Sequence, residues 1–166
     1  MQENLRKLFR NASVSSGTLI HTARGPLPIE QVEIGDEVYT HLARYRLVKA
    51  VLHRPFGSKM VRIDSGSNSL IVRPTHPLFI ERGYMQWIVA DEIVVGDRIP
   101  YTLALISSVC PYSLRQVQTE PSQDIRETPV PIVYGLEVTE DHSYIANNFV
   151  IRDNRVYTGL KKSRHH

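Results

Sequence analysis

The stretch that decides the fold is VTEDHSYIANNFVIRDN, residues 138–154. Its two short apolar segments, 144–146 and 149–151, predict two strands. His142 opens the first strand and Asn154 follows the second, so a general acid or base lies two short strands from an amide that can attack its own carbonyl. Asn cyclisation cuts a backbone without metal or cofactor. The alternative interpretation of this segment alone is an antiparallel hairpin with a surface histidine.

Composition limits the class of protein. A chain of 166 residues and 19.0 kDa fits one domain with a real core. The apolar runs are too short for a membrane span, and residues 1–10 lack the apolar centre of a signal peptide, so we expect a cytoplasmic protein without membrane contact. The net charge of +3 is concentrated near the two ends, which predicts solvated tails rather than a nucleic-acid interface. The single cysteine, Cys110, excludes an internal disulfide, and we expect neither a metal nor a cofactor.

Strand signals dominate the rest of the chain. Helical periodicity is weak after residue 10, apart from possible single turns at 29–32 and 89–93. Residues 112–129 are polar and lack apolar alternation, which predicts a long exposed or disordered loop. Short strands separated by polar or Gly/Ser breaks indicate an all-β architecture. They are expected at 18–22, 37–40, 47–52, 60–63 and 70–72.

One internal repeat is visible. The segment PIEQVEIGDEV at 28–38 recurs as VADEIVVGDRI at 89–99. The two Gly-Asp pairs are 61 residues apart (96 − 35), and each follows an apolar single turn and begins a strand. Glycine permits the tight bend, and the aspartate can accept hydrogen bonds from nearby backbone amides. The repeat predicts two similar β lobes related by a pseudo-two-fold axis.

These segments resemble the sequence blocks of the Hint superfamily, which comprises inteins, bacterial intein-like domains and Hedgehog autoprocessing domains. SVSSGTLIHT at 13–22, followed by the first repeat, is similar to the N-terminal splicing block. VRPTHPLF at 72–79 is similar to the block that carries a family histidine. EDHSY at 140–144 and NFVIRDN at 148–154 are similar to the two C-terminal blocks. The four blocks occur in order.

The resemblance implies a Hint-type horseshoe fold over residues 13–154, with no room for a homing endonuclease, as in a mini-intein. Residues 1–12 and 155–166 would be short extein-like flanks. The expected partners are these flanks alone, in a monomer. The expected activity is autocatalytic and single-turnover, namely protein splicing or cleavage at a junction.

The resemblance also implies a role for several side chains at the N-terminal junction. Ser13 stands where the family has its junction nucleophile, usually cysteine, and would attack the carbonyl of Ala12. Because a serine hydroxyl is a weaker nucleophile than a thiolate, this step needs a base or strain. His76 is the candidate for protonating the departing amide nitrogen, and Thr75 or Arg73 for stabilising the oxyanion.

At the C-terminal junction His142 is the candidate acid or base, and Asp141 could orient its ring. Two registers fit. In the preferred one, Asn154 cyclises, with Asp153 before it and Arg155 after it. In the other, Asp153 is the terminal residue and Arg152 replaces the family's penultimate histidine.

Neither register supplies a hydroxyl or thiol just after the junction, so complete splicing is predicted to be blocked. The sequence is also compatible with a non-catalytic Hint relic, with an engineered inactive precursor, and with an unrelated all-β interaction module.

Overall fold

The computed structural model of the protein describes residues 13–56, 59–100, 105–113 and 131–154. Within these ranges the chain forms strands and two single turns of 3₁₀ helix, which confirms the all-β prediction. The strands are β1 (Val14–Ser15), β2 (Leu19–Thr22), β3 (Gly25–Pro28), β4 (Glu37–Tyr39), β5 (Tyr45–Pro55), β6 (Lys59–Ser65), β7 (Asn68–Val72), β8 (Pro77–Glu81), β9 (Met85–Val89), β10 (Ser108–Ser113), β11 (Ile132–Val138), β12 (Ser143–Ala146) and β13 (Phe149–Arg152). The 3₁₀ turns are η1 (Ile29–Gln31) and η2 (Ala90–Glu92).

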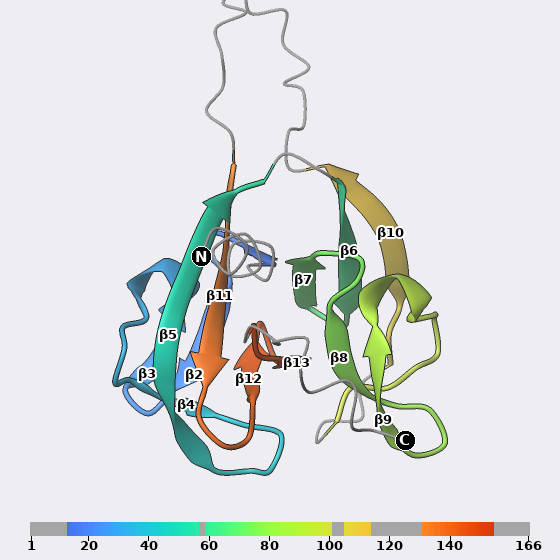
Figure 1. The fold of residues 1–166 in the computed structure, drawn as a ribbon. Helices are drawn as coiled ribbons and strands as arrows, with labels where there is room; N and C mark the ends of the chain where they lie inside the picture. The colour runs from blue at the N-terminus through green and yellow to red at the C-terminus, as the bar shows by residue number, and fades with distance from the viewer. Residues whose placement is uncertain (1–12, 57–58, 101–104, 114–130, 155–166) are drawn as a thin grey trace, which may run out of the picture.

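The strands form one continuous, strongly bent sheet, in the order β10-β6-β7-β1-β11-β5-β4-β2-β12-β13-β8-β9, with β3 paired to β2. Figure 1 shows two arms, one built from β2 to β5 and β11 and the other from β6 to β10, with β12 and β13 between them. This arrangement is the expected horseshoe of two lobes. No helix in the described ranges has the length and apolar character needed to cross a membrane.

The Gly-Asp repeat folds the same way in both lobes. Both glycines have positive φ, 95° and 101°. Asp36 accepts two hydrogen bonds from the guanidinium of Arg24, at 2.9 and 2.9 Å. Asp97 accepts two from Arg82, at 2.8 and 2.7 Å. In both lobes the arginine holds the pKa of the carboxyl below its usual value. The predicted pseudo-two-fold relationship is confirmed.

The 3₁₀ turn at the start of each repeat also makes an equivalent backbone hydrogen bond in the two lobes. The first residue of η1 donates its backbone N–H to the carbonyl of Thr18, at 2.7 Å. The first residue of η2 donates its N–H to the carbonyl of His76, at 2.9 Å. Thr18 and His76 therefore occupy equivalent places in the two lobes.

Two elements cross between the lobes. β1 pairs with β11 on one side and with β7 on the other, in both cases through Val14. The β12–β13 hairpin pairs with β2 through Ala146 and with β8 through Ile151. Ser13 immediately precedes β1, and residues 153–154 immediately follow β13. Both candidate junctions are thus attached to the elements that join the lobes.

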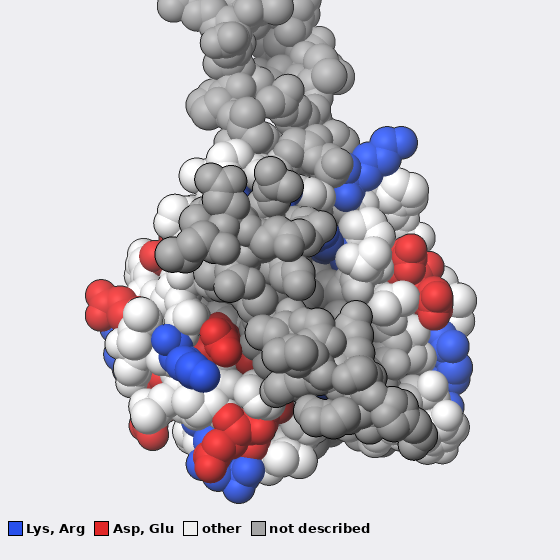
Figure 2. Space-filling view, viewed as in Figure 1, with Lys and Arg blue, Asp and Glu red and all other residues white. Residues whose placement is uncertain are grey.

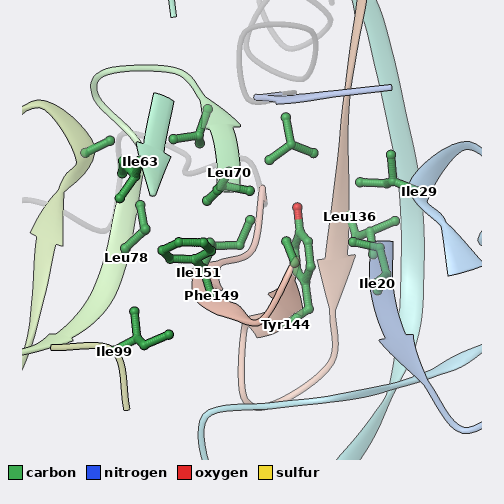
Figure 3. Packing of buried hydrophobic residues seen from close by; sticks show 14 of the residues in the cluster. Ile20, Ile29, Ile63, Leu70, Leu78, Ile99, Leu136, Tyr144, Phe149 and Ile151 are labelled. Carbon is green, nitrogen blue, oxygen red and sulfur yellow. The ribbon is translucent and has the colours of Figure 1, made fainter. Parts of the chain in front are cut away.

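The core lies between the arms and contains residues from both. Tyr144 and Phe149, from the central hairpin, are its largest fully buried side chains. Figure 3 shows them among Ile20 and Leu136 from one lobe and Leu78 from the other. Apolar burial on this scale stabilises the pairing of the lobes, since each large aliphatic or aromatic side chain contributes roughly 1.5–3 kcal/mol.

Charged side chains of opposite sign lie interspersed on the face shown in Figure 2. Among the described residues, ion pairs with partly exposed side chains include Arg46 with Glu140 at 2.8 Å and Arg62 with Asp64 at 3.0 Å. Such pairs on a surface contribute little to stability, on the order of 0–1 kcal/mol.

The structure differs from the sequence prediction in several elements. The sequence did not predict β8 to β11 as strands, and β5 is longer at both ends than the expected 47–52. β3, which begins at Gly25, is not among the expected strands either. Tyr112 belongs to β10 rather than to a loop. The remainder of that predicted loop, from 114, and both flanks, 1–12 and 155–166, lie outside the described residues.

Candidate active site

The edge of β11 brings the two candidate junctions together. The backbone N–H of Ser13 donates to the carbonyl of Tyr134, at 2.8 Å. The backbone N–H of Asn154 donates to the carbonyl of Leu136, at 2.7 Å. These acceptors are two residues apart on one strand, so the same edge holds residues 13 and 154 side by side. The fold therefore brings the two candidate junction segments together.

Ser13 and His76 form a buried hydroxyl–imidazole pair. The Oγ of Ser13 lies 3.0 Å from Nδ1 of His76, and Nε2 of the same ring lies 2.6 Å from the carbonyl oxygen of Arg152. A carbonyl can only accept, so we infer that Nε2 carries the proton and that Nδ1 accepts from the Ser13 hydroxyl. Both side chains are buried. The imidazole is therefore placed to remove the hydroxyl proton.

The electrostatics of His76 suit a base. Burial above all, together with the charges of Arg73 and Arg152, lowers its pKa to about 4, against the opposing effect of the hydrogen bond to the Arg152 carbonyl. At neutral pH the ring is neutral and its Nδ1 lone pair is free of a proton. The sequence predicts His76 as the proton donor to the departing amine. The structure places it first against the hydroxyl, so one ring can take the proton and then return it.

The groups around the Asn154 side chain match the hydrogen-bonding pattern of an amide. Its Oδ1 accepts hydrogen bonds from the Tyr144 hydroxyl at 2.6 Å and from the Leu136 N–H at 3.1 Å. Its Nδ2 donates to the Oγ of Ser13 at 3.1 Å. Gly135 provides the space, because a Cβ there would come within 2.5 Å of the Asn154 Cγ. Two donors on one side and an acceptor on the other fit an amide better than a carboxylate.

Sequence reasoning missed the contacts that Gly135, Leu136 and Tyr144 make with Asn154. Leu136 contributes only its backbone, which no sequence pattern reveals. Tyr144 belongs to the apolar segment 144–146, which predicts only a strand. Gly135 carried a usable signal, since a glycine inside a strand often marks the close approach of another group.

His142 contacts Asp153 rather than its sequence neighbour Asp141. The Oδ2 of Asp153 accepts from the Val138 N–H at 2.9 Å and lies 3.1 Å from Nδ1 of His142. Val138 lies at an irregularity in the pairing of β11 with β5, where the register shifts after Glu137. The His142 side chain is 31% exposed, whereas Asp153 is buried. The imidazole can therefore exchange protons with solvent beside the C-terminal segment.

Asp141 anchors the turn that precedes β12. Its buried carboxylate accepts from the guanidinium of Arg44 at 2.9 Å and from the Thr40 hydroxyl at 2.6 Å. Arg44 above all lowers the pKa of Asp141, to about 2. Asp141 therefore fixes the turn that carries His142, which differs from the expectation that it orients the ring directly.

The remaining candidate residues differ in their surroundings. Thr75 is exposed in the turn before β8. The Arg73 guanidinium lies 5.0 Å from the centre of the Phe56 ring, while its backbone N–H donates to the Ser13 carbonyl at 3.0 Å. The Arg152 guanidinium lies 5.1 Å from the centre of the Trp87 ring. Ala12 and Arg155 lie outside the described residues. Across the described ranges, no three His, Cys, Asp or Glu side chains are grouped closely enough to hold a metal ion.

Comparisons with known proteins agree with this architecture. The family model of the Hint domain matches residues 12–99. Among solved structures, the bacterial intein-like domain from Clostridium thermocellum is similar with a TM-score of 0.66 and 19% identity, over 86% of this chain and 98% of that one. The DnaB intein from Synechocystis sp. PCC 6803 is similar with a TM-score of 0.66 and 15% identity, over 86% and 99%.

The PabCDC21-1 intein is similar with a TM-score of 0.66 and 20% identity, over 86% of this chain and 98% of that one. A search of curated proteins finds no match. At these identities the solved structures support the fold alone. The family model covers more than half of the sequence, and it includes Ser13 and His76 within the matched segment. The chain therefore belongs to the Hint domain family.

Proposed function

We propose that the chain is an intein-like self-processing domain that acts on its own flanks, with Ser13 as the N-terminal nucleophile and Asn154 as the cyclising residue. The observation that carries the proposal is the hydrogen-bonded series from Asn154 Nδ2 to Ser13 Oγ, 3.1 Å, and from Ser13 Oγ to His76 Nδ1, 3.0 Å. It links the nucleophiles of both junctions to one neutral base. Residues 13–154 are the processing domain in this proposal, and 1–12 and 155–166 are its substrates.

In the N-terminal step the Ser13 hydroxyl gives its proton to Nδ1 of His76 while Oγ attacks the carbonyl carbon of Ala12. A C–O bond forms, the C–N bond to Ser13 breaks, and the Ser13 nitrogen takes the proton back from His76. The products are an ester and a free amine, so no proton is gained or lost overall. A neutral imidazole is required at the start, which fits a pKa of about 4 for His76.

In the C-terminal step Nδ2 of Asn154 attacks the carbonyl carbon of the same residue. A C–N bond closes the succinimide ring, and the bond to the Arg155 nitrogen breaks. Nδ2 gives up one proton through Ser13 Oγ to His76, and the Arg155 nitrogen takes one from His142. The relay uses the free hydroxyl of Ser13, so this step belongs to chains in which Ser13 does not carry the ester.

The products of the two steps remain separate. Arg155 has no hydroxyl or thiol that could accept the acyl group. The proposal is therefore junction cleavage by a monomer, with no ligation of residues 1–12 to residues 155–166.

Intact-mass spectrometry of the full chain, followed over days with and without hydroxylamine, tests the proposal. We expect hydroxylamine to release residues 1–12 and we expect slow release of residues 155–166. Ser13→Cys should accelerate the first reaction, because a thiol is more ionised than a hydroxyl at neutral pH, and His76→Ala should slow both reactions.

Asn154→Ala should abolish release of residues 155–166. If release survives that change but is lost in Asp153→Ala, then Asp153 is the terminal residue. The contact between Asp153 and His142 is the observation that favours this second register. A ligated peptide would contradict the proposal, and an unchanged mass in every condition would identify a non-catalytic relic.

A further inference from the structure

The hydroxyl of Tyr144 is the only polar group on a side chain that is otherwise packed in the core. The residue has 0% relative exposure. Figure 3 shows its ring among Leu136, Phe149 and Ile151, with the oxygen directed away from β12. That oxygen donates the hydrogen bond of 2.6 Å to Oδ1 of Asn154. A buried hydroxyl is costly without a partner, so this bond accounts for a tyrosine where a phenylalanine would fill the core equally well.

We propose that Tyr144 is a catalytic residue of the C-terminal step, whose hydroxyl and the Leu136 N–H form a two-donor hole for the charge that develops on Asn154 Oδ1. This inference rests on the proposed cyclisation of Asn154. It assigns to the tyrosine a role distinct from those of the two histidines, which move protons.

The chemistry of an amide nucleophile requires such a hole. The lone pair of Nδ2 is delocalised onto Oδ1, so the nitrogen becomes a good nucleophile only as it loses a proton. The electron pair left by that proton is shared with Oδ1, which acquires negative charge. Nδ2 then bonds to the Asn154 carbonyl carbon, the bond to Arg155 breaks, and Oδ1 remains as an imide carbonyl. Donors already in place stabilise the charge without reorganisation.

The two donors have the positions that this role needs. They reach Oδ1 from different elements, the Tyr144 hydroxyl from β12 and the Leu136 N–H from β11, at 2.6 and 3.1 Å. On the opposite side of the amide, Ser13 Oγ accepts from Nδ2. The acceptor favours loss of a proton from Nδ2, and the donors favour negative charge on Oδ1. Both changes make the nitrogen more nucleophilic. Burial raises the pKa of Tyr144, which keeps the hydroxyl protonated as a donor.

The test uses Tyr144→Phe in the full chain, with release of residues 155–166 and hydroxylamine cleavage before Ser13 measured in the same sample. We expect the ratio of C-terminal to N-terminal cleavage to fall about 100-fold, the usual effect of losing one oxyanion donor. The matched control is Tyr84→Phe, which removes the hydroxyl of an exposed tyrosine in the turn between β8 and β9. A ratio in Tyr144→Phe that equals the ratio of the control overturns the inference.

A second measurement separates hydrogen bonding from packing. Ring-fluorinated tyrosines at position 144 keep the hydroxyl and make it more acidic, so the C-terminal rate should rise with the acidity of the phenol. In chain labelled with ¹³C at asparagine, the Asn154 Cγ resonance should move upfield in Tyr144→Phe. A C-terminal cleavage rate that stays the same across the fluorinated tyrosines overturns the catalytic role of Tyr144. If the resonance moves but the unaltered chain releases no C-terminal peptide, the hydrogen bond stands while the proposed function and the catalytic role both fail.

Discussion

The side-chain amide of Asn154 donates a hydrogen bond to the hydroxyl of Ser13 across a sequence separation of 141 residues. The nucleophile proposed for one junction is thereby the proton acceptor for the other. The two steps share His76 as well, since its Nδ1 accepts from the same hydroxyl. Changes at Ser13 should therefore affect both ends of the chain.

Ser13→Ala should slow release of residues 155–166 even though the alanine lies at the other junction. The change removes the acceptor of the Asn154 Nδ2 proton, and loss of a positioned acid–base group costs about 100-fold or more in rate. Mass spectrometry of the variant over time measures the effect. Ser16→Ala is the control, because the Ser16 hydroxyl donates to Glu30 in an exposed position. Equal rates in the two variants would show that water, and not Ser13, takes the proton.

Gly135→Ala should displace Asn154 and abolish C-terminal cleavage. The new methyl group would lie 2.5 Å from Asn154 Cγ, far inside van der Waals contact. Overpacking of this kind costs about 1–3 kcal/mol in the free energy of unfolding, which urea denaturation measures. Combining the change with Asn154→Gly should recover most of that loss, because the side chain that clashes is gone. A double variant as unstable as Gly135→Ala would locate the strain elsewhere in β11.

The stability of the protein should depend on pH through His76. The folded pKa of about 4 lies below the ordinary value of 6.5, so between these values the unfolded chain binds more protons. The neutral ring stabilises the folded protein fully above about pH 6.5. As the pH falls towards about 4 this stabilisation is lost, and the free energy of unfolding decreases by about 3 kcal/mol in total.

Urea denaturation of the protein and of His76→Leu across this range measures the difference. The contribution of His41, whose pKa burial also lowers, cancels in that difference. Parallel curves for the two proteins would mean that His76 titrates normally.

Arg44→Gln should loosen the turn that carries His142. The change removes the hydrogen bonds between the guanidinium and the buried Asp141 carboxylate, so the free energy of unfolding should decrease. Because the folded pKa of Asp141 is about 2, below its ordinary 3.8, this stabilisation is present above about pH 4 and is lost as the pH falls towards 2.

Thermal melting across that acidic range, with Arg62→Gln as an exposed control, checks the prediction for Arg44. A loss of stability that persists undiminished at the acid end would show that Arg44 acts through packing.

The sequence predicted the architecture well where local pattern and structure coincide. The Gly-Asp repeat predicted two lobes because each pair requires a positive φ at glycine and an acceptor just after it. β11 was missed because Gly135 interrupts an otherwise regular strand pattern. That glycine is explained only by Asn154, which lies 2.5 Å from the position of a Cβ there.

The sequence pattern predicts several candidate residues of the site, but it does not predict their contacts. Asp141 adjoins His142 in sequence, yet the turn has positive φ at both Glu140 and His142, and the Asp141 side chain turns towards Arg44. The carboxylate that reaches the imidazole comes from Asp153, after the hairpin. Adjacency in sequence is therefore a poor guide to hydrogen bonding in a tight turn.

The equivalence of Thr18 and His76 has a consequence for the history of the chain. A half-length ancestor that paired with a copy of itself would have presented the same side chain twice around a symmetry axis. Duplication and fusion of its gene would have freed the two copies to diverge, one to a hydroxyl and the other to an imidazole. A reaction that needs one base beside one nucleophile does not require symmetry, and it is the imidazole of His76 that contacts the Ser13 hydroxyl.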